Sequence, residues 1–410
     1  MSREPWADRS DERGADPQGP TRQDPRQPEG RGDPRPAHPV PSSTVPHPAA
    51  AEDRPVPAAA ARPPAGGAAD PTCPVPAAPR PSPGASRPTA AEGGDDRVDL
   101  ARLVTERANP ATAALDVLDA REICRLINEE DHKVAPAVAQ QLDRIAEAVD
   151  RIAAALRRGG RLFYVGAGTS GRLGVMDAAE CPPTFGVDPE VVQGVIAGGP
   201  AALTGAVEGV EDDRDAGRRD LAARGVRAGD VVVALSASGR TPYCLGALEQ
   251  ARAVGAFTVA VTCNPGSALG AAADLAIEVV VGPEVLAGST RMKAGTAQKM
   301  VLNMLSTAAM VRLGKCYGNL MVDVRPTNAK LRERARRIVM QVVGCDEATA
   351  AELLDRSGDQ VKVAIVMGAT GVDADEARRR LDAHGGMVRR VLEEAGREPG
   401  RAQTPGAPAS

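Results

Sequence analysis

Apolar residues recur at steps of three and four between residues 134 and 156, which is the spacing of one face of an amphipathic helix. We expect one long helix there, ended by Gly159-Gly160. Five short apolar runs follow, and each predicts a buried strand: residues 162–165, 191–197, 231–235, 258–261 and 275–281. Because most of these runs are separated by enough chain for a helix, the pattern predicts an α/β fold with a doubly wound parallel sheet.

The two ends of the chain differ from this middle part. Most of the 35 prolines precede residue 95, in stretches with too little apolar material to offset the entropy lost on ordering. Beyond residue 326, short helical patterns are separated by single glycines, which indicates a small helical domain. We therefore expect a disordered tail at residues 1–98 and an α/β catalytic domain at residues 99–326. A helical domain at residues 327–392 and a second loose tail at residues 393–410 should follow.

Composition narrows the class of protein. The formal net charge is −4 and aromatic residues make up 2%, so the chain offers neither a basic field nor stacking platforms, and we expect no nucleic-acid partner. No apolar run follows the first residues or is long enough to cross a bilayer, so we expect a cytoplasmic protein without a membrane partner. Seven cysteines without a C-x-x-C pair predict reduced thiols and no metal site. Only His132 and His384 lie outside the tail, so proton transfer is expected to depend on carboxylates.

Two loops rich in glycine and hydroxyl side chains follow the first and third expected strands, GAGTSG at residues 166–171 and SASGRT at residues 236–241. Ligands bind outside the carboxyl ends of parallel strands, and hydroxyls, free N–H groups and a helix N-terminus together suit a monophosphate. GAGTSG also matches the dinucleotide fingerprint G-x-G-x-x-G. The second strand, however, ends in glycines rather than in the acidic residue that a ribose needs, so we expect no nucleotide cofactor.

These loops resemble the sugar isomerase (SIS) domain of phosphosugar enzymes and regulators. The resemblance implies that the sugar phosphate is held by Ser170, Ser236, Ser238 and Thr241. Further candidates to bind the substrate in the same loops are Gly168, Thr169 and Gly239. Many SIS domains have a polar residue at the position of Ala237, so that contact is either missing here or supplied by the backbone.

Three further blocks narrow the resemblance: GTSGRLGVMDAAECPPTFG at residues 168–186, EGVED at residues 208–212 and GPEVLAGSTRMKAGT at residues 282–296. They closely resemble the N-acetylmuramic acid 6-phosphate etherases. The resemblance implies removal of the lactyl ether from C3 of the sugar, which gives N-acetylglucosamine 6-phosphate and D-lactate without a cofactor. It also implies a homodimer with its sites near the subunit boundary.

The reaction of this family needs a base and an acid, and two carboxylates suffice for it, one protonated and one ionised. The resemblance gives Glu180 the role of the acid that protonates the leaving lactate and Glu211 the role of the base at C2. By residue type alone, a glutamate in such a position is more often a solvated helix residue than a catalytic one, and Glu208 lies one turn from Glu211. Glu180 is more distinctive, because we expect Pro182-Pro183 to end its helix and to hold it at a fixed turn.

A cluster of hydroxyl and cationic residues precedes the helix expected at residues 294–313. Ser289, Thr290 and Lys293 are candidates there to bind the lactyl carboxylate or the phosphate. Lys293 is also a formal candidate for a Schiff base, but its hydroxylic surroundings do not favour one. His132 most simply belongs to a solvated helix start, although related isomerases use a histidine for ring opening.

Two other functions are compatible with the SIS resemblance. One is an aldose-ketose isomerase of hexosamine phosphates, which would release no acid. The other is a phosphosugar-sensing regulator, although the Pro/Ala-rich start of this chain lacks the helix-turn-helix that such bacterial regulators usually carry. Residues 351–354 and 361–364 loosely resemble ubiquitin-associated three-helix units, which supports a small bundle but not ubiquitin binding.

Overall fold

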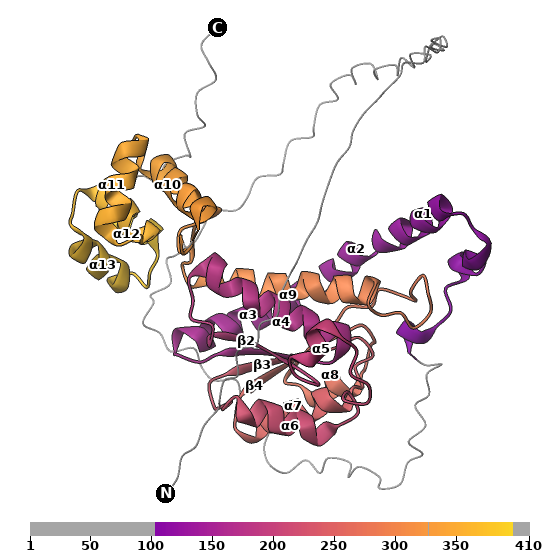
Figure 1. The fold of residues 1–410 in the computed structure, drawn as a ribbon. Coiled ribbons are helices and arrows are strands. Elements are labelled where there is room, and N and C mark those ends of the chain that lie inside the picture. The colour runs from indigo at the N-terminus through magenta and orange to yellow at the C-terminus, as the bar shows by residue number, and fades with distance from the viewer. Residues whose placement is uncertain (1–102, 327, 397–410) are drawn as a thin grey trace, which may run out of the picture. The chain divides into compact units, whose positions relative to one another are not determined.

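The computed structural model describes residues 103–326 and 328–396, so the tail expected at residues 1–98 lies outside the described part. Its centre is a parallel sheet covered by helices, as the sequence predicted (Figure 1). The strand order in this sheet is β2-β1-β3-β4-β5. The strands are β1 (Leu162–Gly166), β2 (Val192–Ile196), β3 (Val231–Ser236), β4 (Phe257–Thr262) and β5 (Leu275–Glu278). The chain leaves β1 to one side for β2 and returns to its other side for β3, which makes the gap between β1 and β3 the topological switch point.

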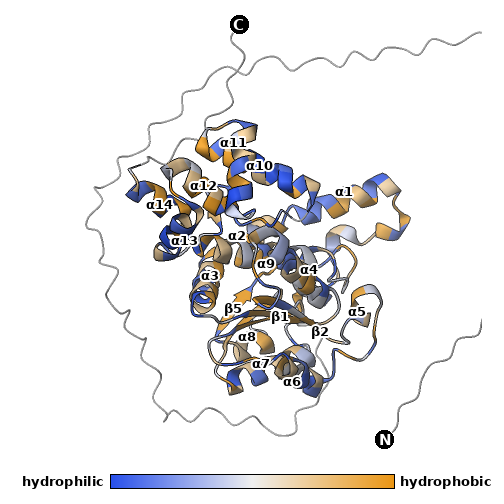
Figure 2. Cartoon of the chain, turned by 60° about the vertical axis from the view of Figure 1, so that its left-hand side comes forward, coloured by the Kyte–Doolittle hydropathy of each residue, from blue (hydrophilic) through white to orange (hydrophobic). Residues whose placement is uncertain are grey.

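Helices cover both faces of the sheet, as Figures 1 and 2 show from two directions. Because side chains alternate along a strand, Tyr164 and Val233 face a core formed with α2, α3, α4 and α9, whereas Phe163 and Val232 face α6, α7 and α8. The helices of this domain are α2 (Val134–Ala139), α3 (Leu142–Arg157), α4 (Gly168–Phe185), α5 (Ala201–Thr204), α6 (Arg214–Ala223), α7 (Pro242–Ala253), α8 (Ala268–Ala272) and α9 (Lys293–Arg312).

A segment of short helices precedes α2. It contains three 3₁₀ turns and one α-helix: η2 (Val104–Glu106), η3 (Pro110–Thr112), η4 (Leu115–Val117) and α1 (Ala120–Asp131). In Figure 1, α1 extends away from the sheet and its covering helices. Its apolar residues Ile123, Leu126 and Ile127 are only half-buried, because none of them joins the cores of the sheet.

The structure corrects two expectations about helices. The single helix expected at residues 134–156 is two helices, because the chain turns at Gln140 and Gln141, and the Gln141 side chain accepts a hydrogen bond from the backbone of Glu278 on β5. Pro182 and Pro183 do not end α4 either, since α4 continues to Phe185. Proline removes a backbone donor but its fixed φ is helical, so two prolines are accommodated in the last turn.

The C-terminal helices have a hydrophobic core of their own. They are α10 (Ala329–Val343), α11 (Glu347–Ser357), α12 (Val361–Thr370), α13 (Ala374–Ala383) and α14 (Val388–Glu394). The glycines noted in the sequence, Gly344, Gly358 and Gly371, end α10, α11 and α12 in the left-handed conformation that glycine adopts readily. This core also includes Val322 and Val324, which lie beyond the small hairpin β6 (Cys316–Tyr317) and β7 (Leu320–Met321).

Among the described residues, no helix is long and apolar enough to cross a membrane.

Candidate active site

The two hydroxyl-rich loops lie side by side at one edge of the sheet. β1 and β3 pair in parallel with Gly166 opposite Leu235, so both strands end at the same level. Neighbouring strands are about 4.8 Å apart. The loop after Gly166 and the loop after Ser236 therefore meet at the switch point, where ligands of open α/β sheets bind.

The loop after β3 forms a compact cluster of hydroxyls. Ser236 Oγ lies 2.8 Å from Thr241 Oγ1 and 3.3 Å from Ser238 Oγ. Ser236 is buried, whereas Ser238 and Thr241 are half-buried at the start of α7. Gly239 has a φ of +69°, and a Cβ at this position would lie 2.3 Å from Ser267 Cβ, so only glycine fits. The cluster combines hydroxyl donors with the N-terminus of a twelve-residue helix.

Ala237 contributes its backbone rather than a side chain. The methyl group is buried in the core, and the carbonyl accepts hydrogen bonds from Cys263 N and from Asn264 Nδ2, both at 3.0 Å. Asn264 Oδ1 in turn accepts a hydrogen bond of 2.7 Å from Val104 N, and its Nδ2 donates to Thr105 Oγ1 at 3.0 Å. Asn264 thus connects the hydroxyl loop to the segment that precedes α1.

The loop after β1 supplies backbone donors. Gly168, Thr169 and Ser170 form the first turn of α4, whose N–H groups have no partner within the helix. The Ser170 hydroxyl is only 8% exposed and donates to Gln298 Oε1 on α9 at 2.8 Å. Gly168 and Thr169 are therefore more open to a ligand than the Ser170 side chain.

The start of α9 approaches the same loop. A Cβ at Gly295 would lie 3.5 Å from both Thr169 Cγ2 and the Thr290 carbonyl oxygen, so these three residues are neighbours. Ser289 and Thr290 are half-buried in the turn before α9. The structure thus brings Thr290 and Gly295 of the third motif next to the β1–α4 loop.

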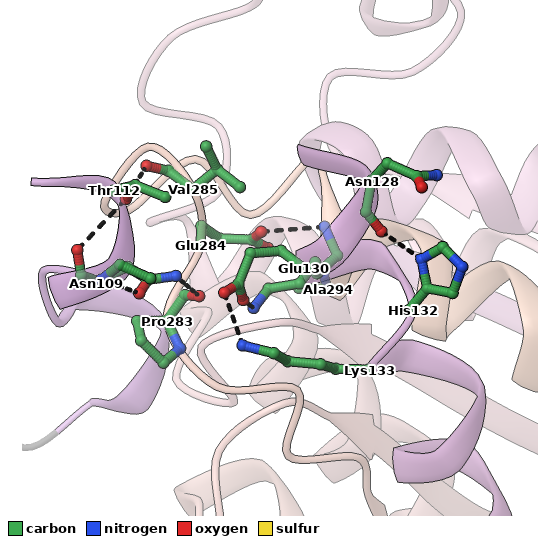
Figure 3. A network of polar contacts seen from close by, with 12 residues as sticks. Asn109, Thr112, Asn128, Glu130, His132, Lys133, Pro283, Glu284, Val285 and Ala294 are labelled. Carbon is green, nitrogen blue, oxygen red and sulfur yellow. Dashed lines mark hydrogen bonds and ion pairs between the residues drawn. The ribbon is translucent and has the colours of Figure 1, made fainter. Parts of the chain in front are cut away.

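The structure places the Lys293 side chain in a buried ion pair. Its side chain is 1% exposed, and Nζ forms an ion pair of 2.5 Å with Glu130 Oε2. The second oxygen of Glu130 pairs with Lys133 Nζ at 2.6 Å. Figure 3 shows this network, in which Glu284 accepts hydrogen bonds from the backbone N–H groups of Lys293 and Ala294 at the start of α9. The ammonium of Lys293 is therefore paired with Glu130 inside the protein.

The pKa values of the two carboxylates in this network shift in opposite directions. Burial raises the pKa of Glu130, but hydrogen bonds from Lys133, Lys293 and Asn109 outweigh it and lower the pKa to about 2. Burial also raises the pKa of Glu284, and this effect exceeds that of the two backbone N–H groups. His132 is exposed at the end, not the start, of α1, with Nδ1 2.6 Å from the carbonyl oxygen of Asn128.

Glu211 lies at the edge of the sheet that carries the two loops. Its backbone carbonyl accepts a hydrogen bond of 3.0 Å from Tyr243 N in the first turn of α7. Its exposed side chain lines a cavity of about 370 Å³ together with Glu208, Gly168 and Arg172. One of the two candidate carboxylates is therefore next to the loops.

Glu180 lies far from the loops of its own chain. It is exposed in α4, twelve residues after Gly168, and a helix rises about 1.5 Å per residue, or roughly 18 Å over this stretch. A hexose phosphate held at the loops is too short to span that distance. A single chain thus brings together the loops and Glu211, but not Glu180.

Comparisons with known proteins identify the family of this chain. The model of the glucokinase regulatory protein N-terminal SIS domain matches residues 144–252, and the SIS domain model matches residues 214–308. An N-acetylmuramic acid 6-phosphate etherase of Edwardsiella ictaluri is 57% identical over 297 residues, which cover 72% of this chain and 99% of the relative. The etherases of Aeromonas hydrophila (56% identical) and Mycolicibacterium smegmatis (55% identical) cover 71% and 72% of this chain, and 98% and 99% of their own lengths. The chain belongs to the N-acetylmuramic acid 6-phosphate etherase family.

Among solved structures, a phosphoheptose isomerase from Francisella tularensis is similar at 18% identity and a TM-score of 0.36, covering 46% of this chain and 98% of that one.

Two residues at the site were not singled out in the sequence of this etherase family member. Gln298 supports Ser170 from α9, but the two residues are 128 positions apart, so no local pattern relates them. Arg172 is part of the motif at residues 168–174 and lines the cavity beside Glu211. A cation one turn into the helix after a phosphate loop is the signal that could have identified it.

Proposed function

We propose that this protein cleaves the D-lactyl ether of N-acetylmuramic acid 6-phosphate to give N-acetylglucosamine 6-phosphate and D-lactate, a carbon–oxygen lyase step in the recycling of cell-wall amino sugars. The observation that carries this function is the 57% identity to an etherase over 99% of its length. The hydroxyl cluster at the switch point and the neighbouring Glu211 support it, because they supply a phosphate site and a carboxylate at one edge of the sheet.

The phosphate is bound first by groups that the fold has already oriented. Ser238, Thr241 and the N–H groups at the starts of α4 and α7 donate to its oxygens, and Gly168, Thr169, Gly239, Ser289 and Thr290 line the approach. Ser236 and Ser170 hold the two loops, through Thr241 and Gln298 respectively. This arrangement directs the ring-opened sugar away from the sheet with its C2 and C3 toward the carboxylates.

The reaction then needs a base and an acid. Glu211 takes the C2 proton of the open-chain aldehyde, the C3–O bond breaks, and Glu180 protonates the departing lactate oxygen. The resulting unsaturated aldehyde adds water at C3, with the hydrogen returning to C2. Because Glu180 is roughly 18 Å along α4 from the loops of its own chain, the acid comes from the Glu180 of a second copy.

An exposed apolar surface supports a homodimer of this kind. A groove of about 1000 Å³ lies between α3 and α9 and is lined mainly by apolar residues: Leu142, Ile145, Val149, Met300, Met304, Ala308 and Val311. Met176, one turn before Glu180 on the same face of α4, is 46% exposed. A symmetric partner that covers these residues would bring Glu180 to the other subunit's site.

We assign the activity to the cytoplasm. The described part of the chain has six free cysteines, which suits a reducing compartment.

The direct test is to incubate the full-length protein with N-acetylmuramic acid 6-phosphate and to assay D-lactate. Release of lactate and of N-acetylglucosamine 6-phosphate supports the etherase. A ketose phosphate without lactate would indicate the isomerase, and binding without turnover would indicate a sensor. Mixing subunits that carry Glu180→Gln with subunits that carry Glu211→Gln tests the shared site, because a mixed dimer keeps one intact pair and regains activity.

A further inference from the structure

The cavity beside the β1–α4 loop combines charges of both signs. It is bordered by the start of α4 and by the segment of residues 206–211 that follows α5. Among the described residues that line it, Glu208 and Glu211 are acidic and Arg172 is basic. An anion that enters this cavity is repelled by two carboxylates and attracted by one guanidinium.

Arg172 is anchored but retains free donors. It lies in the second turn of α4, is half-buried, and donates from Nη2 to the carbonyl oxygen of Gly205 at 2.7 Å. Within residues 103–326 and 328–396, no carboxylate lies within 4 Å of its guanidinium. By contrast, Arg161 and Arg218 are paired with Asp230 and Glu249. A guanidinium has five N–H donors, so Arg172 can still bind a carboxylate with two parallel hydrogen bonds.

The substrate of the proposed function carries a second anion that its product lacks. The phosphate is bound by the hydroxyl loops, whereas the lactyl carboxylate is attached through oxygen to C3. Glu211, the base at C2, and Arg172 line the same cavity, and C2 and C3 are adjacent carbons. The carboxylate of a substrate held for proton removal by Glu211 therefore lies on the side of Arg172. The cation considered earlier for this role, Lys293, is buried in its pair with Glu130.

We propose that Arg172 binds the lactyl carboxylate and selects the ether substrate over hexosamine phosphates that lack it. This inference rests on the proposed function. The arginine offsets the repulsion from Glu208 and Glu211, and its hydrogen bond to Gly205 holds the guanidinium beside the segment that carries both glutamates. Arg172 thus discriminates by charge at C3 while the hydroxyl loops bind the part common to substrate and product.

A double-mutant cycle with one change in the protein and one in the substrate tests this role through kcat/KM. The protein change is Arg172→Met, and the substrate change replaces the lactyl carboxylate by the neutral carboxamide. For the wild-type protein we expect the carboxamide to lower kcat/KM by about 10- to 100-fold. Arg172→Met should lower kcat/KM for the acid by a similar factor, but should change it little for the carboxamide. Arg172→Lys keeps the positive charge but cannot form two parallel hydrogen bonds, so its kcat/KM for the acid should lie between those of the wild type and Arg172→Met.

Inhibition by N-acetylglucosamine 6-phosphate, which has the phosphate but no carboxylate, completes the test. Its inhibition constant should be the same for the wild type and Arg172→Met. Arg252→Met is the matched control, because Arg252 also donates to a backbone carbonyl, that of Ala272, but lies at the end of α7 outside the cavity. It should leave all these values unchanged.

Two results would overturn the assignment. An equal loss for the acid and the carboxamide would mean that Arg172 only holds the loop through Gly205. Weaker inhibition by N-acetylglucosamine 6-phosphate would mean that it binds the phosphate. If the wild type released no D-lactate, the proposed function would fail, and calorimetric titration of the wild type and Arg172→Met with acid and carboxamide would still decide the role of Arg172. A selective loss of affinity for the acid would support it, and equal affinities would reject it.

Discussion

Four glutamates of this etherase family member form two contrasting pairs. Glu130 and Glu284 are buried, and hydrogen bonds and ion pairs occupy their oxygens. Glu180 and Glu211 are exposed, and among the described residues no cation lies within 4 Å of either carboxylate. A carboxylate whose oxygens are all occupied stabilises the fold, whereas one that is open can exchange protons with a substrate. The comparison shows that glutamates of the same chain differ in burial and in the number of hydrogen-bond partners around their carboxylates.

The two cations near the site differ in the same way. Lys293 is part of the motif that resembles the etherases, but its charge neutralises Glu130 inside the protein. Arg172 has one backbone partner and borders an open cavity. Proximity to a binding loop therefore does not make a charge available to a ligand.

The largest effects are expected at the exposed pair. Glu180→Gln and Glu211→Gln should each lower kcat by about 10²- to 10⁴-fold, because each removes a group that we propose transfers a proton. The free energy of unfolding should change by no more than about 0.5 kcal/mol, since both side chains are at the surface. D-lactate release and urea denaturation measure the two quantities. Turnover at the wild-type rate in either variant would move that role to another residue.

The buried pair should show the opposite pattern. Glu130→Gln leaves Lys293 charged and without its partner in the interior, which should cost about 3–5 kcal/mol of unfolding free energy. Glu129→Gln is the matched control, because Glu129 is the exposed neighbour paired with Arg125, and it should cost less than about 1 kcal/mol. Equal, small effects in urea denaturation would show that the buried pair does not stabilise the fold.

The buried Glu130 should also make the stability of the protein sensitive to acid. The pKa of Glu130 is lowered from 4.5 to about 2 in the folded protein, so its stabilisation is complete above about pH 4.5 and is lost as the pH falls toward 2. The loss should be about 3 kcal/mol. Urea denaturation at pH 6, 4.5 and 3 should show a steeper decline for the wild type than for Glu130→Gln. Parallel declines would assign the acid sensitivity to other groups.

The smallest effect concerns the hydroxyl cluster. Ser238→Ala removes one hydroxyl and should weaken the binding of N-acetylglucosamine 6-phosphate by about tenfold, the usual worth of one hydrogen bond to a charged group. Thr370→Ala removes a hydroxyl that donates to the Val366 carbonyl in α12 and should leave binding unchanged. Calorimetric titration measures both. Unchanged binding in Ser238→Ala would exclude this hydroxyl from the phosphate site.

The sequence was informative where structure depends on neighbours along the chain. The five apolar runs became the five strands, and the hydroxyl loops lie where a parallel sheet puts the ends of its strands. Pairings between distant residues could not be predicted in this way. Glu130 and Lys293 are 163 positions apart, so nothing local indicated that Lys293 is buried. The continuation of α4 through Pro182 and Pro183 to Phe185 was not anticipated either, because the proline rule predicts that a helix ends there.

Asn264 gives the hydroxyl loop a dependence on a remote part of the chain. It bonds Val104 and Thr105 with one set of contacts and the Ala237 carbonyl with another. The rigidity of the turn between Ser236 and Thr241 thus depends partly on residues more than 130 positions earlier in the chain. Proteolysis or an engineered truncation that removed the segment around Val104 and Thr105 would therefore loosen the turn that we propose binds the phosphate. It would do so without changing any residue that contacts the ligand.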